Sequence, residues 1–274
     1  MQTTKLFFTI IIFILIGIFL LVKGKQPNDE TQIVLPIITS VTSNPEDRPD
    51  VNPNNIEITY ENDKYVIDYL QIPKRAKLNL IANFEEKESG LTLANKFNCD
   101  YAINGGFYQK NDKPLGLFIT NGEKYGELTA SSIANGFFWE DKNGDRFIGK
   151  NLPVDFNKQQ FILQTGPYIH AGEYKLKMVR DEKSRRMLLA VDSGNLLYFV
   201  SIYMKDSLYE GPYLSDVPNI FSKEEVQKKL KINSLLNLDG GTASFFYMKG
   251  NQSYYILSEL TSIGSLFCLN NPRN

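Results

Sequence analysis

The sequence predicts an α+β domain, in which a mixed, strand-rich sheet carries a few flanking helices and follows an N-terminal membrane helix. Short runs of β-branched and aromatic residues recur along the chain, and turn dipeptides separate them. Only two segments beyond residue 55 have helical patterning. A long uncharged run near residue 1 predicts the membrane helix.

This uncharged run, Leu6–Val22, has 17 residues and is interrupted only by Thr9 and Gly17. A helix of that length, at about 1.5 Å per residue, covers most of a hydrocarbon core roughly 30 Å thick. No small-residue cleavage site follows it. We therefore predict a single-pass signal anchor over residues 1–25, which contacts the membrane through residues 6–22 and carries an extracytoplasmic domain. A cleaved signal peptide, which would give a secreted protein, is the alternative.

Residues 26–55 are predicted to be a tether between this anchor and the folded domain. Five prolines stand among Asn, Asp, Ser and Thr, a composition that cannot bury a core: Pro27, Pro36, Pro45, Pro49 and Pro53. Residues 56–274 are predicted to form one domain of ordinary size.

Strand patterns dominate this domain. The predicted strands are Ile56–Tyr60, Tyr65–Leu70, Leu78–Ala82, Tyr101–Asn104, Leu117–Thr120, Phe137–Glu140, Arg146–Ile148, Phe161–Gln164, Met187–Asp192, Leu196–Tyr203, Leu235–Leu238, Phe245–Lys249 and Tyr254–Leu257. The Asn143-Gly144 dipeptide predicts a tight hairpin. The surrounding residues also suggest a calcium loop, but an EF-hand needs Gly and Glu where this chain has Arg146 and Leu152.

Two helices are predicted. Leu91–Phe97 is short, and Ser222–Leu230 begins with Ser222 and Glu225 at the spacing of a capping box. Many strands with few helices, in no regular alternation, favour α+β over α/β.

The composition excludes several classes of function. Thirty Lys and Arg against 31 Asp and Glu give a formal net charge of −1, so no nucleic-acid partner is expected. One histidine, His170, and two cysteines are too few for the usual zinc sites, and no metal or cofactor is expected. Cys99 and Cys268 are either a disulfide or two buried thiols.

Three turns that contain glycine are the candidate site. They are 103–108, 164–167 and 237–244, and each directly follows an apolar run. Paired glycines let the backbone approach a ligand and present N–H groups to it. For any one turn, tight turn geometry is the alternative explanation.

Five blocks that contain these turns resemble the phosphodiester glycosidase family: LTLANKFNCDYAINGGFY, GLFITNGE, LQTGPYI, SRRMLLAVDSGNLLYFV and SKEEVQKKLKINSLLNLDGGTAS. The resemblance implies an Asn-Gly-Gly-Phe turn, a Gly-Pro turn, an Arg before a strand and an Asp-Gly-Gly turn, all around one surface cavity. In this chain these are 104–107, 166–167, Arg186 and 239–241. The chain departs from the family at Thr242 and Ala243, and again at Met187-Leu188, which leaves the substrate's identity open.

The resemblance implies cleavage between an anomeric carbon and a phosphate oxygen, through an oxocarbenium-like state. Arg186 would hold two phosphate oxygens and Asp239 would be the base or nucleophile, while Asn104 would orient the sugar or water. The other expected substrate-binding residues are Gly105, Gly106, Phe107, Thr165, Gly166, Gly240, Gly241, Thr242 and Ser244. Alternatively, Asp239 starts an Asx-turn, and Arg186 belongs with Arg185 to a solvated basic rim.

The sequence thus predicts a membrane-tethered or exported hydrolase of sugar-phosphodiester linkages in cell-surface glycans. Its partner would be a glycan or sugar-phosphate substrate. A non-catalytic domain that binds carbohydrate or phosphoglycan on the same fold is the alternative.

Overall fold

The computed structural model describes residues 51–170, 176–207 and 209–271. All of them fall within one unit, Arg48–Asn274. The predicted anchor and the predicted tether up to residue 50 lie outside the described residues. Within the described ranges, no helix combines the length and the apolar character that a membrane crossing needs.

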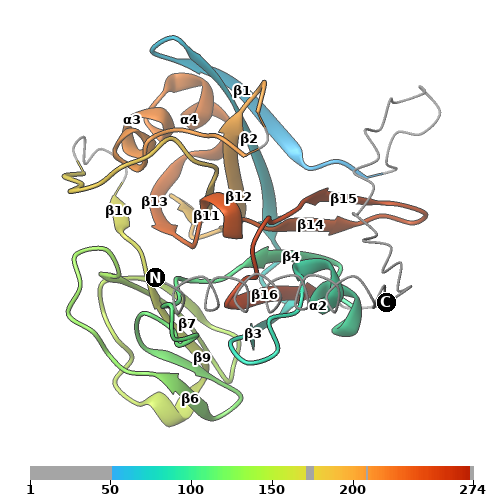
Figure 1. Cartoon of the computed structure of the whole chain (residues 1–274), viewed down its shortest axis with the longest axis vertical. Coiled ribbons are helices and arrows are strands. Elements are labelled where there is room, and N and C mark those ends of the chain that lie inside the picture. Colours follow the sequence, from blue (N-terminus) through green and yellow to red (C-terminus); the bar gives the residue numbers. More distant parts are fainter. Residues whose placement is uncertain (1–50, 171–175, 208, 272–274) are drawn as a thin grey trace, which may run out of the picture. The chain divides into compact units, whose positions relative to one another are not determined.

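The described strands form three sheets (Figure 1). The first sheet has the order β1 (Asn54–Tyr60), β2 (Asp63–Ile72), β12 (Leu197–Met204), β11 (Arg186–Asp192), β13 (Ile232–Asn237) and β10 (Tyr168–His170). The second has the order β15 (Tyr254–Leu257), β14 (Phe246–Lys249), β4 (Tyr101–Asn104), β16 (Ser265–Asn270) and β3 (Lys77–Ala82). The third has the order β6 (Glu123–Gly126), β5 (Phe118–Thr120), β9 (Gln159–Thr165), β7 (Gly136–Asp141) and β8 (Arg146–Gly149).

This arrangement confirms a strand-rich domain but corrects the expected single mixed sheet. Every pairing between these strands is antiparallel. Parallel neighbours need crossover connections of a dozen or more residues, usually helical, and the domain has few helices to provide them.

Three strands were not predicted. β6 and β10 have only four and three residues, too few for a periodic pattern. β16 is a central strand with five consecutive buried residues, so it does not alternate between apolar and polar. In addition, β1 begins at Asn54, inside the expected tether. The predicted hairpin around Asn143-Gly144 is confirmed, because β7 and β8 pair across it.

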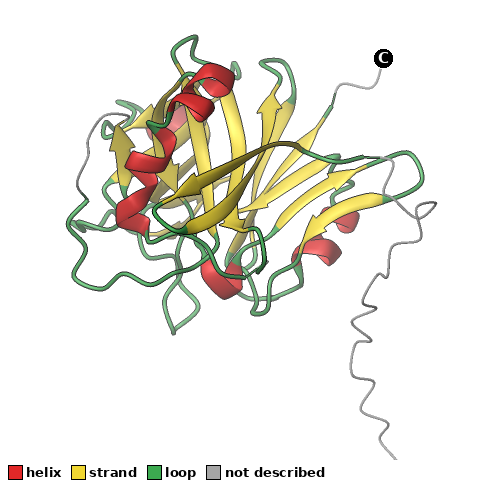
Figure 2. Ribbon diagram, turned by 90° about the horizontal axis from the view of Figure 1, so that it is seen from above, coloured by secondary structure: helices red, strands yellow, loops and turns green. Residues whose placement is uncertain are grey.

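The helices are short and lie at the periphery of the sheets (Figure 2). They are α2 (Gly90–Lys96), α3 (Val217–Phe221) and α4 (Glu224–Leu230), with single turns of 3₁₀-helix at Phe156–Lys158, Leu214–Asp216 and Gly241–Ala243. The sequence did not predict α3, and the predicted capping box at Ser222 is wrong. Lys223 is the N-cap of α4, and the Ser222 hydroxyl instead donates to the Pro218 carbonyl, 2.7 Å away, in the preceding helix.

One aromatic side chain joins the core of all three sheets. Phe267 of β16 is fully buried. Its ring lies 6.4 Å from that of Phe199 in the first sheet, and 5.3 and 5.7 Å from those of Phe138 and Phe161 in the third. A second core lies between the first sheet and helices α3 and α4. The ends of strands from different sheets are therefore held close together.

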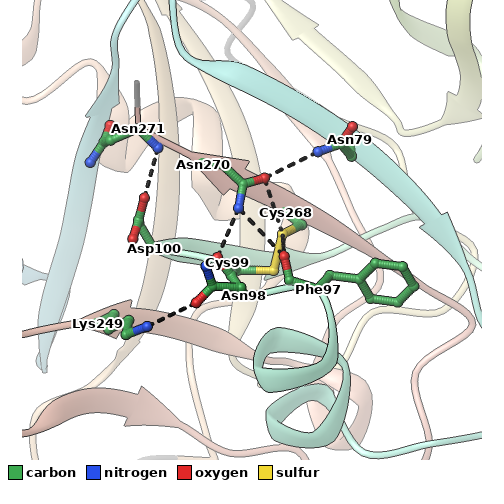
Figure 3. Close-up of a disulfide and its surroundings, with 9 residues drawn as sticks. All are labelled: Asn79, Phe97, Asn98, Cys99, Asp100, Lys249, Cys268, Asn270 and Asn271. Atoms are coloured by element: carbon green, nitrogen blue, oxygen red, sulfur yellow. Dashed lines mark hydrogen bonds between the residues drawn. A yellow bond between two sulfur atoms is a disulfide. The ribbon is translucent and has the colours of Figure 1, made fainter. Parts of the chain in front are cut away.

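Cys99 and Cys268 form a disulfide across 169 residues of sequence (Figure 3). It joins the segment after α2 to β16. Beside it, the Asn270 amide donates to the carbonyl of Asn98 at 2.8 Å, and Asp100 accepts the N–H of Asn271 at 2.7 Å. Cys99 and Cys268 are therefore a disulfide and not two buried thiols.

Candidate active site

The three glycine turns follow strands of three different sheets. Asn104 ends β4 in the second sheet, Thr165 ends β9 in the third, and Asn237 ends β13 in the first. Loops at strand ends are common places for binding and catalytic residues. Because the three sheets share one core, turns that are distant in sequence meet here.

The buried amide of Asn104 connects two of the turns. Its Nδ2 donates to the carbonyls of Asp239, at 2.8 Å, and Gly105, at 3.1 Å, while its Oδ1 accepts the Phe245 N–H at 2.9 Å. The Asp239 N–H in turn donates to Gly105 O at 3.0 Å. Both amide hydrogens of Asn104 are therefore used within the protein. Asn104 therefore positions the turn that carries Asp239, and its amide hydrogens are not free for the expected contact with sugar or water.

The glycines at 105 and 106 allow close packing. A Cβ on Gly105 would lie 2.1 Å from Ser265 Oγ, and one on Gly106 would lie 3.1 Å from Thr165 Oγ1. The N–H of Gly105 donates to Ser265 O at 2.8 Å. In the third turn, Gly240 N–H donates to Asp239 Oδ1 at 2.9 Å and Gly241 N–H to Arg185 O at 2.9 Å. Of the four N–H groups in the glycine pairs 105–106 and 240–241, three are thus occupied within the protein and are not free to face a phosphate.

The second turn is fixed to the third. Thr165 Oγ1 donates to Asn237 O at 3.0 Å, and Asn237 Nδ2 donates to Gly166 O at 3.0 Å. Gly166 has φ +149°, and a Cβ there would lie 2.7 Å from Ile133 O, so only glycine fits. Two buried atoms beside the turns, Asn237 Oδ1 in the third turn and Ser265 Oγ next to Gly105 of the first, have no hydrogen-bond partner among the described residues. Water or a ligand hydroxyl would satisfy such atoms.

Asp239 has the environment of an acid or base. The residue is partly exposed, and its carboxylate accepts one hydrogen bond from the described residues, from Gly240 N–H. Burial raises the pKa of Asp239 to about 7, and the bond from Gly240 opposes that shift. The predicted alternative, an Asx-turn, needs a bond to the residue two positions on, whose N–H instead donates to Arg185. A carboxyl with a pKa near neutral pH is suited to proton transfer.

Arg186 lies beside the third turn but has partners within the protein. Its Nε donates to Pro212 O at 3.1 Å, and its Nη2 lies 3.3 Å from Asp181 Oδ1 and also donates to Glu182 O. A Cβ on Gly240 would lie 4.0 Å from Arg186 Cδ. A phosphate could therefore take up the expected two-pronged contact only by displacing part of this set.

Arg185 is the structural residue that sequence reasoning missed. Its side chain is fully buried, so it is no part of a solvated rim. Its Nη2 donates to the carbonyls of Ser244 and Ser258, both at 2.6 Å, and its own carbonyl accepts the Gly241 N–H. The Arg185-Arg186 doublet before a strand was the available signal, but doublets usually mark a surface.

A family model named phosphodiester glycosidase matches residues 97–269, more than half of the chain. The chain belongs to the phosphodiester glycosidase family. The match includes all three glycine turns, Arg186 and the disulfide, so the family resemblance of the sequence blocks is confirmed.

Solved structures support this fold for the phosphodiester glycosidase domain. It is similar to the zebrafish N-acetylglucosamine-1-phosphodiester alpha-N-acetylglucosaminidase catalytic domain auto-inhibited by its pro-peptide, with a TM-score of 0.56 and 17% identity over 80% of this chain and 82% of that one. A hypothetical protein from Synechocystis is similar with a TM-score of 0.51 and 13% identity, over 78% of this chain and 61% of that one. No curated protein sequence matches the chain.

The remaining predicted residues of this phosphodiester glycosidase domain differ in exposure. Thr242 is exposed, and its Oγ1 accepts from Thr261 Oγ1 at 3.2 Å. Phe107 is partly exposed, while Ser244 is fully buried and supports the turn from behind. His170 is exposed at the end of the edge strand β10. In the described part of the chain, no three His, Cys, Asp or Glu side chains gather to hold a metal ion.

Proposed function

We propose that this domain hydrolyses sugar phosphodiesters, and that Asp239 is its general base or nucleophile. The state of Asp239 carries the proposal. Asp239 is partly exposed as a residue, burial of its carboxyl raises the pKa to about 7, and Asn104 holds its turn where strands of three sheets end. Membership of the phosphodiester glycosidase family supports a hydrolase of this kind.

Hydrolysis of a sugar phosphodiester needs little help from a general acid, because phosphate is a good leaving group. The ionised carboxylate would either attack the anomeric carbon or take a proton from the attacking water. With the pKa of Asp239 raised to about 7, about half of the molecules hold this carboxylate at neutral pH. We therefore expect kcat/KM to rise with pH through a midpoint near 7.

The decisive experiment measures hydrolysis of a GlcNAc-phosphate-sugar diester by the wild type and by Asp239→Asn. We expect the wild type to hydrolyse the diester. The variant should still bind the ligand, but its kcat should fall at least a hundredfold. Asp68→Asn is the control, because Asp68 is a buried carboxyl whose partners are Tyr203 and Tyr255, outside the three glycine turns. Full turnover by Asp239→Asn would refute the role of Asp239.

A non-catalytic domain that binds phosphoglycans is the second candidate. The internal partners of Arg186 and of three glycine N–H groups favour it, because these groups are not free to hold a phosphate in this structure. A wild-type protein that binds a panel of sugar diesters but hydrolyses none would establish this function instead.

We further propose that the domain is tethered outside the cytoplasm through residues 6–22 and acts on cell-surface glycans. The uncharged run over these residues and the disulfide between Cys99 and Cys268 support this location, since disulfides persist in oxidising compartments. Fractionation should place the full chain in membranes and a chain that starts at residue 48 in the soluble fraction. The full chain in the soluble fraction would overturn the tether.

A further inference from the structure

A surface hollow of about 510 Å³ lies between the loop that precedes β3 and the turn of the β7–β8 hairpin. No residue of the three glycine turns lines it. Its lining includes four exposed basic residues: Lys74, Arg75, Lys77 and Lys142. We call this hollow, with these four residues, the basic trough.

The acidic groups of the basic trough have partners within the protein: Glu140 is paired with Arg146, while the Asp141 carboxylate accepts backbone N–H groups and keeps its negative charge. Arg146 Nε donates to Glu140 Oε2 at 2.5 Å, and Asp141 Oδ1 accepts the N–H groups of Asn143, at 2.8 Å, and Asp145, at 2.9 Å. The two other guanidinium nitrogens of Arg146 donate to carbonyls in the loop before β3, which fixes this loop against the hairpin. The base of the trough is therefore built from fixed groups.

The four basic residues have no such partners. None of them forms an ion pair with a described residue. Four unpaired positive charges thus surround one hollow on a chain whose formal net charge is −1. Like charges repel at short range, and an anion relieves that repulsion. The charge pattern therefore favours an anionic ligand. Lysines on an exposed edge strand such as β3 also prevent sheet-to-sheet pairing, and the experiment below separates the two explanations.

The trough continues into two neighbouring hollows. One of about 340 Å³ shares Lys74 and Arg146 with it, and another of about 570 Å³ shares Lys142 and Gln160. An elongated run of hollows with the four basic residues in its central part suits a chain of repeated anionic groups better than a single small anion.

The trough lies one strand length from the candidate active site. Strand β7 begins at Gly136, which pairs with Thr165, and ends at Asp141 in the trough lining. Five steps of about 3.3 Å separate these two ends by about 17 Å. A polymer of a few repeats is long enough to span that distance.

We propose that the basic trough is a second binding site, which holds a chain of repeated phosphodiester groups while one of its linkages lies at Asp239. The inference that the trough binds an anionic chain depends on its charges and its shape. The inference that this binding serves catalysis depends on the proposed function. Such a site would make the protein prefer a polymeric phosphodiester over a small one.

The experiment compares two variants with equal changes in charge. The trough variant replaces Lys74, Arg75, Lys77 and Lys142 with Gln. The control variant replaces with Gln four exposed lysines outside the three hollows: Lys64, Lys110, Lys113 and Lys229. The probe is a short, soluble poly(glycerol phosphate) chain, and its affinity is measured at low and at physiological salt concentration.

We expect the wild type to bind this probe more weakly as the salt concentration rises. Binding releases cations from the probe, and a higher salt concentration opposes that release. The trough variant should lose affinity by roughly ten- to a hundredfold at low salt, and the control variant by less than about threefold. Equal losses in the two variants would overturn the proposal. Equal affinity of the wild type for poly(glutamate) of the same charge would also overturn it, because any polyanion, with or without phosphodiester groups, would then suffice.

Hydrolysis separates this proposal from the proposed function. Both variants should cleave a small GlcNAc-phosphate-sugar diester as the wild type does, while the trough variant alone should show a raised KM for a polymeric substrate. If the wild type cleaves no diester, the proposed function fails, and the difference in binding still decides whether the trough is a site.

Discussion

Asp239 and Asp68 show how two carboxyls with raised pKa values can differ within one domain. Asp68 accepts hydrogen bonds from Tyr203, at 3.1 Å, and Tyr255, at 2.6 Å, and burial raises its pKa to about 6. Asp239 accepts one bond from the backbone and is partly exposed, and burial raises its pKa to about 7. The well-satisfied carboxyl is structural. The partly exposed one is available for proton transfer.

The raised pKa of Asp239 makes the protein less stable as pH rises. The folded pKa of about 7 exceeds the ordinary value of 3.8 for an unfolded chain, so the contribution of Asp239 to stability is complete below about pH 4 and is lost as pH rises through 7. Asp239→Asn should therefore raise the free energy of unfolding at about pH 8, on the order of 1–3 kcal/mol, and change it little near pH 4. Denaturant unfolding at both pH values measures this, and a loss of stability at pH 8 would contradict it.

Arg186→Lys tests whether Arg186 holds phosphate. An ammonium group cannot reproduce the planar contact of a guanidinium, so kcat/KM for a phosphodiester should fall roughly ten- to a hundredfold. A plain glycoside of the same sugar should be affected much less, because it lacks the phosphate. Arg180→Lys is the matched control, since Arg180 is exposed. Equal losses on both substrates would mean that Arg186 only supports the fold through Asp181 and Pro212.

At the scale of elements, the site depends on the turn after β4 packing tightly against β16. Gly105 lies so close to Ser265 that a Cβ would be 2.1 Å from Ser265 Oγ and 3.2 Å from Ser265 Cβ. The hydroxyl of Ser265 has no hydrogen-bond partner among the described residues. The contact therefore requires a glycine on one strand and tolerates the loss of a hydroxyl on the other.

A double-mutant cycle tests this contact. Gly105→Ala should lower the free energy of unfolding by about 1–3 kcal/mol, because the added methyl collides with the hydroxyl. Ser265→Ala alone should change the free energy of unfolding by less than about 1 kcal/mol. Added to Gly105→Ala, the same substitution should restore part of the stability that Gly105→Ala loses. Losses that simply add would show that the two residues do not meet.

At the scale of the whole molecule, β16 joins parts of the chain that are far apart in sequence. Phe267 packs against rings from the two other sheets, and its neighbour Cys268 is bonded to Cys99. A disulfide that closes a loop of 169 residues restricts the unfolded chain strongly.

Removing this bond should therefore destabilise the domain without changing its site. We expect the double variant Cys99→Ala/Cys268→Ala to lose about 2–5 kcal/mol of the free energy of unfolding. Reductant should lower the stability of the wild type to a similar degree and leave the double variant unchanged. A wild type that is insensitive to complete reduction would contradict the expected contribution.

The sequence by itself determined most strands, the hairpin at Asn143-Gly144, the three glycine turns and the family. These features depend on local alternation, on turn residues and on short motifs, which adjacent residues carry. It could not predict three antiparallel sheets, the central strand β16 or the disulfide. Strand partners lie far apart in sequence, as Lys77 and Asn270 do, and so do the two cysteines, at 169 residues. A strand buried on both faces also has no alternating pattern.

Only the tertiary structure decided which groups of the candidate site are available. The motif around Asn104 reads as a ligand-binding turn, yet its amide and the N–H of Gly105 are used within the protein. Arg185 reads as a surface residue, yet it is buried and holds the carbonyls of Ser244 and Ser258. The pKa of Asp239 likewise depends on what surrounds it. The physical reason is that hydrogen-bond partners and burial arise from residues that meet only when distant strand ends come together.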